Sequence, residues 1–268
     1  MASESRSHDR RTGPARQAVA ALLAAVFVSG CAGLPGLAWS SRNADPLQRS
    51  PSGGLTGKAV RLAERAVLAS PRDAARRARL GSAYLKAGRF ASATEAFDDA
   101  LELGEESVAT VLGLALAEIA RGHDQAALGL LNDWRDVIPA TDLGLALALA
   151  GEAPRGVAVL TDAIRGGDRT ARVRQNLAFA FALAGYWREA RLMMVQDVPA
   201  DQVPARIREW AQLGTAEARQ ARVARLLDVP LTADLGQPAA LALTNFPGPA
   251  AMTGQVAAQP QVERDSGG

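Results

Sequence analysis

The spacing of small residues along the middle of the chain is the feature that most constrains its fold. A period of 34 residues relates Ala59, Ala93 and Ala127, Gly88 and Gly122, and Ala66 and Ala100. The spacing shortens to 29 between Gly122 and Gly151 and returns to 34 at Gly185. A unit of this length cannot bury its apolar face alone, so the period predicts stacked units that share one continuous core.

Composition indicates that these units are helical. Hydrophobic residues make up 48% of the 268 residues, which is enough for a core, but aromatic residues make up only 4%. Alanine supplies much of the apolar content, and it is the strongest helix former. Few aromatic side chains and many alanines favour closely packed helices over sheets. We therefore predict an all-α fold.

The stretch RARLGSAYLKAGRFASATEAFDDAL at residues 77–101 resembles the tetratricopeptide repeat. The matching positions are Leu80, Gly81, Tyr84, Ala93 and Phe97. The resemblance implies a right-handed α-solenoid (TPR solenoid) of antiparallel helix pairs, in four units after a half unit at residues 58–70. The units are 74–107, 108–139, 140–170 and 171–204. Positions that depart from the family pattern are Arg77, Glu118, Trp134 and Asp197.

Two helices at residues 201–214 and 215–228 are predicted to cap the solenoid, since solenoid ends need a polar covering element. The second carries a one-sided stripe of arginines, namely Arg219, Arg222 and Arg225. The stripe indicates either a solvated face of the cap or a contact with acidic lipid or another anionic partner.

A partner groove follows from the family resemblance, because tetratricopeptide solenoids bind peptides or protein surfaces on the concave face of their first helices. The candidate groove residues are Ser82, Lys86, Leu112, Leu116, Ile119, Leu145, Leu149, Arg172, Gln175 and Phe179. We expect Phe179 and Leu149 to anchor a partner and Arg172 to pair with its acidic group. An apolar groove is seldom left open. The chain's own residues 237–246 could cover it, or the groove side chains could pack between neighbouring helices.

The only cysteine, Cys31, stands at the end of an apolar run at residues 18–28 that follows three arginines. A basic start, a short apolar core and small residues at the end are typical of a secretory signal. Val28-Ser29-Gly30-Cys31 resembles the lipobox of bacterial lipoproteins, which implies lipidation of Cys31 and cleavage before it. Ala32 stands where inner-membrane retention signals carry Asp, so the resemblance implies a periplasm-facing anchor in the outer membrane of a Gram-negative bacterium.

Three other interpretations of this segment stay open. Residues 17–41 carry no charge and are numerous enough to span a membrane, although Gly30, Gly33, Pro35 and Gly36 interrupt the second half. The segment could also be an ordinary cleaved signal with an incidental cysteine, or a buried core segment.

The segment at residues 173–213 carries a narrower resemblance, to TadD-type tetratricopeptide lipoproteins of the tight-adherence (Flp) pilus system. It rests on Arg174-Gln175-Asn176-Leu177, Ala184-Gly185 and Arg188-Glu189-Ala190. The resemblance implies a scaffold that helps to assemble the outer-membrane secretin of the pilus and its associated proteins. Two alternatives are an adaptor of other outer-membrane or peptidoglycan machinery, and an enzyme regulator or hydrolase hidden in the repeats.

Charge and motifs give no support for enzymes or nucleic-acid binding. The formal net charge is +2, and the leader at residues 1–30 carries all of it, with four Arg against Glu4 and Asp9. No catalytic motif, paired metal-ligand histidines or complete phosphate-binding loop occurs in the sequence. We predict no catalytic residue, metal, cofactor or small-molecule substrate, and partners that are proteins, with the membrane contacted through the lipidated N-terminus.

The chain is thus divided into four segments. Residues 1–30 are a lipoprotein signal peptide and residues 31–57 a lipidated flexible tether. Residues 58–230 are the solenoid with its capping helices. Residues 231–268, which contain Pro238, Pro247, Pro249, Pro260 and five Gly, are predicted to be a disordered tail.

Overall fold

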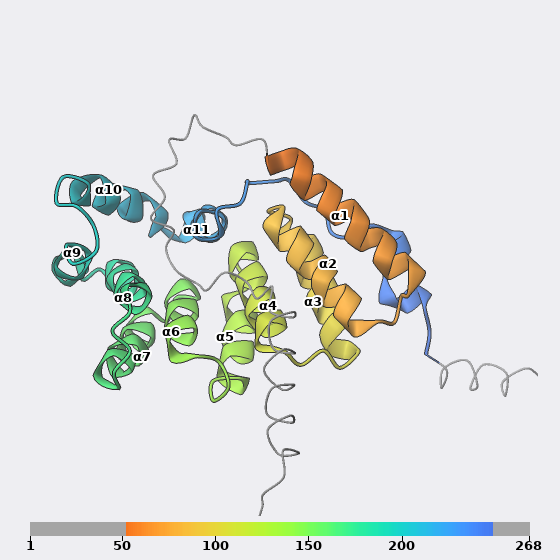
Figure 1. The fold of residues 1–268 in the computed structure, drawn as a ribbon, viewed down its shortest axis with the longest axis horizontal. Helices are drawn as coiled ribbons and strands as arrows, with labels where there is room; N and C mark the ends of the chain where they lie inside the picture. Colours follow the sequence, from red (N-terminus) through yellow and green to blue (C-terminus); the bar gives the residue numbers. More distant parts are fainter. Residues whose placement is uncertain (1–51, 249–268) are drawn as a thin grey trace, which may run out of the picture. The chain divides into compact units, whose positions relative to one another are not determined.

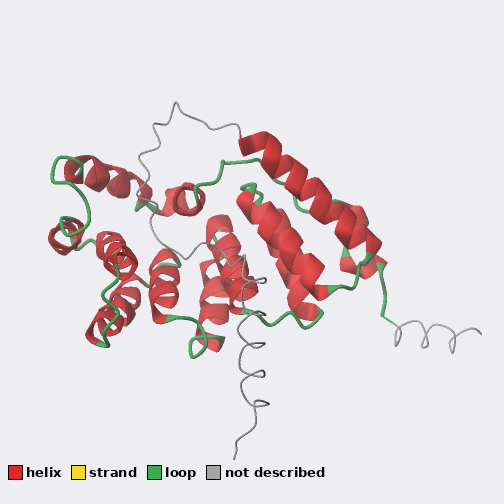
Figure 2. Cartoon of the chain, in the orientation of Figure 1, coloured by secondary structure: helices red, strands yellow, loops and turns green. Residues whose placement is uncertain are grey.

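The structure is a computed structural model that describes residues 52–248, with side chains from residue 56 onward. This part of the chain is all-helical, as predicted, and contains no strand (Figures 1 and 2). Among the described residues, no helix combines the length and apolar character needed to cross a membrane. Cys31, the predicted signal peptide and most of the predicted tether lie outside the described residues.

Within the described residues the first helix is α1 (Ser52–Ala69), and ten further α-helices follow it. They are α2 (Ala74–Lys86), α3 (Phe90–Glu102), α4 (Val108–Arg121), α5 (Asp124–Asp133), α6 (Ala140–Leu149), α7 (Ala153–Arg165), α8 (Ala171–Leu183), α9 (Trp187–Met194), α10 (Val203–Leu213) and α11 (Arg219–Leu227). Successive helices pack as pairs, α2 on α3, α4 on α5, α6 on α7 and α8 on α9, and each pair falls within one predicted unit. This arrangement is consistent with a helical repeat.

Helix α1 includes the last six residues of the predicted tether, 52–57, so the start of the helical part is corrected to Ser52. The low helix propensity of Gly53, Gly54 and Gly57 favoured a tether. Packing decides otherwise, because α1 lies along α2 and buries Val60 and Val67 in the core. Tertiary burial of an apolar helix face commonly outweighs propensity at a helix end.

The repeated glycines end the first helix of each pair. Gly88, Gly122, Gly151 and Gly185 have φ between 70° and 94°, in the left-handed region that glycine enters without steric cost. Side chains cap the starts of three first helices: Asp73, Ser107 and Thr170 each accept a hydrogen bond from a backbone N–H three residues on. The sequence therefore sets both ends of these helices locally.

Glycine also permits close helix crossings around Phe97, which is fully buried in α3. A Cβ at Gly81 of α2 or at Gly113 of α4 would come within 2.6 Å of the Phe97 ring. The same device recurs where α6 crosses α7, because a Cβ at Gly144 would lie 2.6 Å from Leu160. A large side chain beside a glycine at each crossing gives the dense packing of the core.

Candidate functional site

The predicted groove residues lie on the first helices α2, α4, α6 and α8, but most of them are not accessible. Buried positions are Leu112, Leu116, Ile119, Leu145, Leu149 and Phe179. Ser82, Arg172 and Gln175 are half-buried, and Lys86 is exposed. The six apolar side chains therefore belong to the core and form no open groove, which is the alternative that the sequence left open, namely packing between neighbouring helices.

The C-terminal helices help to cover this face. Trp210 of α10 packs on Phe179 of α8, with ring centroids 5.1 Å apart and the rings tilted by 59°. Helix α11 packs on α4 and buries Val223 and Leu226 (Figure 1). The predicted caps thus cover part of the first-helix face. The apolar side chains of the first helices are therefore buried against α10 and α11 of the same chain and do not need a partner to cover them.

Arg172 was expected to pair with an acidic group of a partner. It instead forms an ion pair with Asp142 of α6. The neighbouring Arg174 pairs with Asp197, just beyond α9, which explains the aspartate at a position that is usually alanine. Arg172 therefore joins two successive helix pairs, whereas Arg174 joins the two helices of one pair. The acidic group that Arg172 contacts in the structure belongs to the chain itself and not to a partner.

The arginine stripe of α11 does not form a solvated face. Arg219 pairs with Asp124 of α5, with 2.7 Å between Nη2 and Oδ2, and Arg225 donates to Glu209 of α10 at 2.6 Å. Arg222 is buried and donates to backbone carbonyl groups. A pocket of about 180 Å³ lies beside Arg219 and Arg222. Sequence reasoning missed this site, because its walls combine residues 124–183 of the repeats with residues 214–222 near α11.

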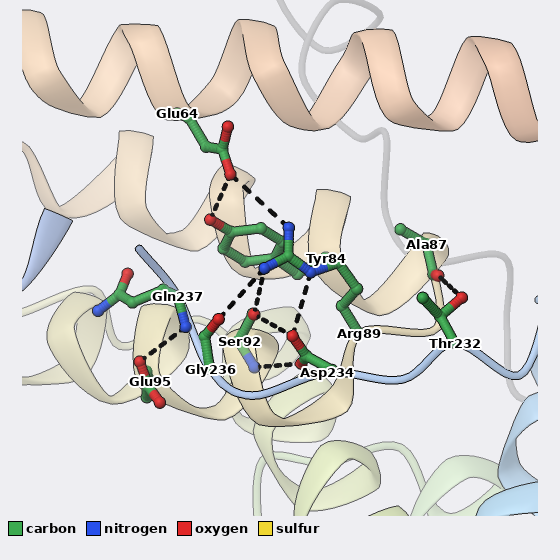
Figure 3. A network of polar contacts seen from close by, with 10 residues as sticks. All are labelled: Glu64, Tyr84, Ala87, Arg89, Ser92, Glu95, Thr232, Asp234, Gly236 and Gln237. Carbon is green, nitrogen blue, oxygen red and sulfur yellow. Dashed lines mark hydrogen bonds and ion pairs between the residues drawn. The ribbon is translucent and has the colours of Figure 1, made fainter. Parts of the chain in front are cut away.

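A second polar site is formed by the C-terminal segment, which we define as residues 229–248. Asp234 lies between Ser92 and Arg89 at the start of α3 (Figure 3). Its carboxylate accepts hydrogen bonds from the Ser92 backbone N–H (2.7 Å), the Ser92 hydroxyl (2.7 Å) and Arg89 Nε (3.1 Å). Burial alone would raise the pKa of Asp234, but the hydrogen bonds from Ser92 and Arg89 outweigh it and hold the pKa below its ordinary value.

The network continues from Arg89 into the first helices. Arg89 stacks over the Tyr84 ring at 4.5 Å, and Tyr84 donates its hydroxyl to Glu64 of α1 at 2.8 Å (Figure 3). Burial and the bond to Glu64 raise the pKa of Tyr84, so its hydroxyl stays protonated at any ordinary pH. The C-terminal segment is thus connected to α1 through Arg89 and Tyr84.

Further along, the segment follows α3 and the start of α2. Gln237 donates its backbone N–H to Glu95 at 3.0 Å and its side-chain amide to Asp99 at 3.1 Å. The Leu241 carbonyl accepts from Arg77 Nη1 at 3.0 Å, and Arg77 also pairs with Asp99. Arg77, which replaces the tryptophan of the repeat pattern, is fully buried and binds the segment.

The prediction of a disordered tail is therefore wrong for residues 231–248, while residues 249–268 lie outside the described residues. Leu241 and Leu243 are buried, so the segment adds apolar contact to its hydrogen bonds. Its hydrogen bonds go to Arg72, Ala87, Arg89, Ser92, Glu95, Arg77 and Asp99 rather than to the predicted groove residues. The segment does not act as the groove cover that the sequence suggested.

Within residues 52–248, no group of three or more His, Cys, Asp or Glu side chains is placed to hold a metal ion. The comparisons with known proteins add no further assignment. No family model matches the chain, and no curated protein and no solved structure matches it significantly.

Proposed function

We propose that the chain is a non-enzymatic tetratricopeptide-type scaffold that holds protein partners near a membrane. The observation that carries this proposal is the packing of four successive helix pairs, with repeated glycines at their turns and crossings. Repeat architectures of this kind present extended surfaces to other proteins. The match of residues 77–101 to the tetratricopeptide pattern supports the finer assignment to a right-handed TPR solenoid.

The partner class follows from the narrower resemblance of residues 173–213 to TadD-type lipoproteins. On that basis the scaffold serves Flp pilus assembly, with the secretin and its assembly proteins as partners. Arg174 and Asp197, both inside the resembling segment, form an ion pair that fixes the α9 end to α8. The resemblance thus includes residues that determine the geometry of the last helix pair.

The anchor is proposed to be a lipid on Cys31, in the outer membrane and facing the periplasm. Cys31→Ser should abolish uptake of labelled acyl chains and release the protein from the outer-membrane fraction. Replacing the nearby Ser40 by Ala is a matched control that leaves the lipobox unchanged. If wild-type protein takes up no acyl chain while the Cys31→Ser variant still fractionates with the outer membrane, the anchor proposal is refuted.

Deleting the gene in its native host tests the pilus proposal. We expect fewer secretin multimers and fewer surface pili, with both restored by a plasmid copy. Crosslinking followed by mass spectrometry should recover the secretin with the wild-type protein. Normal multimers and pili would refute the pilus role. Crosslinks to other envelope proteins would then support the alternative, an adaptor of outer-membrane or peptidoglycan machinery.

A further inference from the structure

The pocket beside α11 lies where several helix ends meet. Its walls include Leu149 and Leu183, the last residues of α6 and α8, and Ala153, the first residue of α7. Arg219 and Arg222 of α11 also line it. The volume of about 180 Å³ suits a small group and the end of a chain segment, but not a folded partner. The pocket has both apolar and charged walls.

Positive charge exceeds negative charge in this pocket. Asp124 is the acidic residue among its walls, and it already pairs with Arg219. Arg222 has only 6% of its surface exposed, and its hydrogen bonds go to the backbone carbonyls of Leu213 (3.1 Å) and Leu149 (3.2 Å). Two guanidinium groups therefore share one carboxylate, which leaves one positive charge.

Arg222 is incompletely satisfied where it stands. Its Nε is buried and has no hydrogen-bond partner, a state that is unusual for a buried donor. Burial and the neighbouring Arg219 lower the pKa of Arg222, but an arginine remains charged at neutral pH. Burying a cation without a bonded anion costs free energy that a bound anion would recover.

The start of α7 adds to the positive potential. This helix has 13 residues, and its N-cap residue, Glu152, makes no side-chain cap hydrogen bond. The first backbone N–H groups of a helix point outward from its positive end and bind anions. Pro154 carries no N–H, and the amides of Gly151 and Glu152 already donate to carbonyls of α6. The Ala153 N–H is therefore the donor that this helix start offers to the pocket.

We propose that this pocket binds a carboxylate group, with Arg222 and Arg219 supplying the charge and the Ala153 N–H at the start of α7 supplying a hydrogen-bond donor. A monoanion matches the surplus of one positive charge, whereas a phosphate dianion would exceed it. The apolar walls, Leu149, Leu183 and Ala148, suit the carbon atoms next to the carboxylate. The carboxylate could belong to the C-terminus of a protein segment or to a free small acid. The first of these sources rests on the proposed scaffold function.

Acetate tests the pocket independently of the scaffold function. In ¹⁵N NMR spectra of the full chain, sodium acetate should cause saturable shifts of the Arg222 Nε–H signal and of the Gly151 and Ala153 amides. Sodium chloride at equal ionic strength should not cause them. Arg219→Gln should weaken acetate binding at least fivefold. Arg225→Gln, a control on the same helix that removes the pair with Glu209, should leave it unchanged.

Two peptides separate the sources of the carboxylate. Acetyl-Ala-Ala with a free C-terminus should bind more tightly than acetate if the pocket receives a chain end, and its C-terminal amide should not bind. Acetate binding with no gain from the peptide would assign the pocket to a free small acid. The absence of saturable shifts with acetate and with the peptide would overturn the proposal, whatever the outcome of the pilus experiments.

A measurement of thermal stability tests the positive charge of the pocket without a ligand titration. Ala216 is exposed and lines the pocket, so Ala216→Glu places a carboxylate at its edge. We expect its Tm to exceed that of Ala216→Gln by about 2–4 °C, the shift expected for one hydrogen bond of ordinary strength in a chain of this size, because Ala216 is exposed. The difference should vanish in the Arg219→Gln background. Equal Tm values in the wild-type background would contradict a cationic pocket.

Discussion

Asp234→Ala should detach the C-terminal segment from α3. The side chain of Asp234 is only 5% exposed and receives hydrogen bonds from the Ser92 backbone N–H, the Ser92 hydroxyl and Arg89. Its removal leaves the Ser92 backbone N–H without its acceptor, and this donor must then find water or remain unpaired. Arg89 loses its carboxylate partner at Nε but keeps its contacts with Glu64 and with the Gly236 carbonyl.

The magnitude follows from this geometry. Removing one partner of a buried ion pair costs about 3–5 kcal/mol, and a single hydrogen bond to a charged group contributes about 1.5–3 kcal/mol. The Arg89 side chain is 26% exposed and can be rehydrated, which places the cost near the lower limit. We therefore expect about 3 kcal/mol, which is about a 100-fold change in the equilibrium for local opening.

Amide hydrogen exchange measures this opening at the segment itself. The Leu241 N–H bonds the Pro238 carbonyl at 2.8 Å, and the Phe246 N–H bonds the Leu243 carbonyl at 2.9 Å. Asp234→Ala should speed the exchange of both amides about 100-fold, while amides in the middle of α8 keep their rates.

Two variants control this experiment. Asp234→Asn keeps one oxygen acceptor and should have a smaller effect. Asp136→Ala removes a carboxylate that is 86% exposed and should change nothing by more than about 0.5 kcal/mol. Exchange at Leu241 and Phe246 within twofold of wild type in Asp234→Ala would refute the role given to Asp234.

Three further predictions concern acid, helix crossings and the first-helix face. The pKa of Asp234 is lower in the folded state than in the unfolded state. The contribution of Asp234 to the free energy of unfolding is therefore complete above the unfolded pKa of about 3.9 and is lost as pH falls through the folded pKa. The urea stability difference between wild type and Asp234→Asn should therefore be constant from pH 8 to 5 and shrink below pH 4; a constant difference down to pH 2 would contradict this. Gly144→Ala should destabilise by about 1–3 kcal/mol, because its Cβ would lie 3.0 Å from the Gly156 carbonyl, whereas Gly129→Ala, which meets open space within α5, should stabilise by about 0.5–1 kcal/mol. Leu149→Ala should lower the free energy of unfolding by about 2–5 kcal/mol, and unchanged urea stability would show that Leu149 is not a core residue.

The repeating part of the fold could be predicted because its determinants are local. A glycine at the end of each first helix and alternating large and small residues act within one unit, so the 34-residue period reveals them directly. Gly88 and Gly122 occupy left-handed turns, and Gly81 packs on Phe97, at the positions that the pattern gives them. The start of α1 was missed because burial of Val60 and Val67 outweighs the low propensity of its glycines.

The C-terminal segment could not be predicted because its determinants are distant in sequence. Asp234 bonds Ser92 across 142 residues, and Leu241 bonds Arg77 across 164. Proline and glycine content indicates only that no regular helix forms there. Arg77 did carry a signal, since a buried arginine in place of a tryptophan needs acceptors. One of these is Asp99, and another is the Leu241 carbonyl.

The buried groove residues show why a repeat pattern alone does not locate a partner surface. An apolar residue on a first helix has the same sequence signature whether a partner or the chain's own helices cover it. Phe179 is covered by Trp210 of α10, and α4 is covered by α11. The candidate groove positions that stay accessible are polar, namely Ser82, Lys86, Arg172 and Gln175. We therefore place the proposed contact with another molecule at the pocket beside Arg222, where several helix ends meet, and not along the apolar face of the first helices.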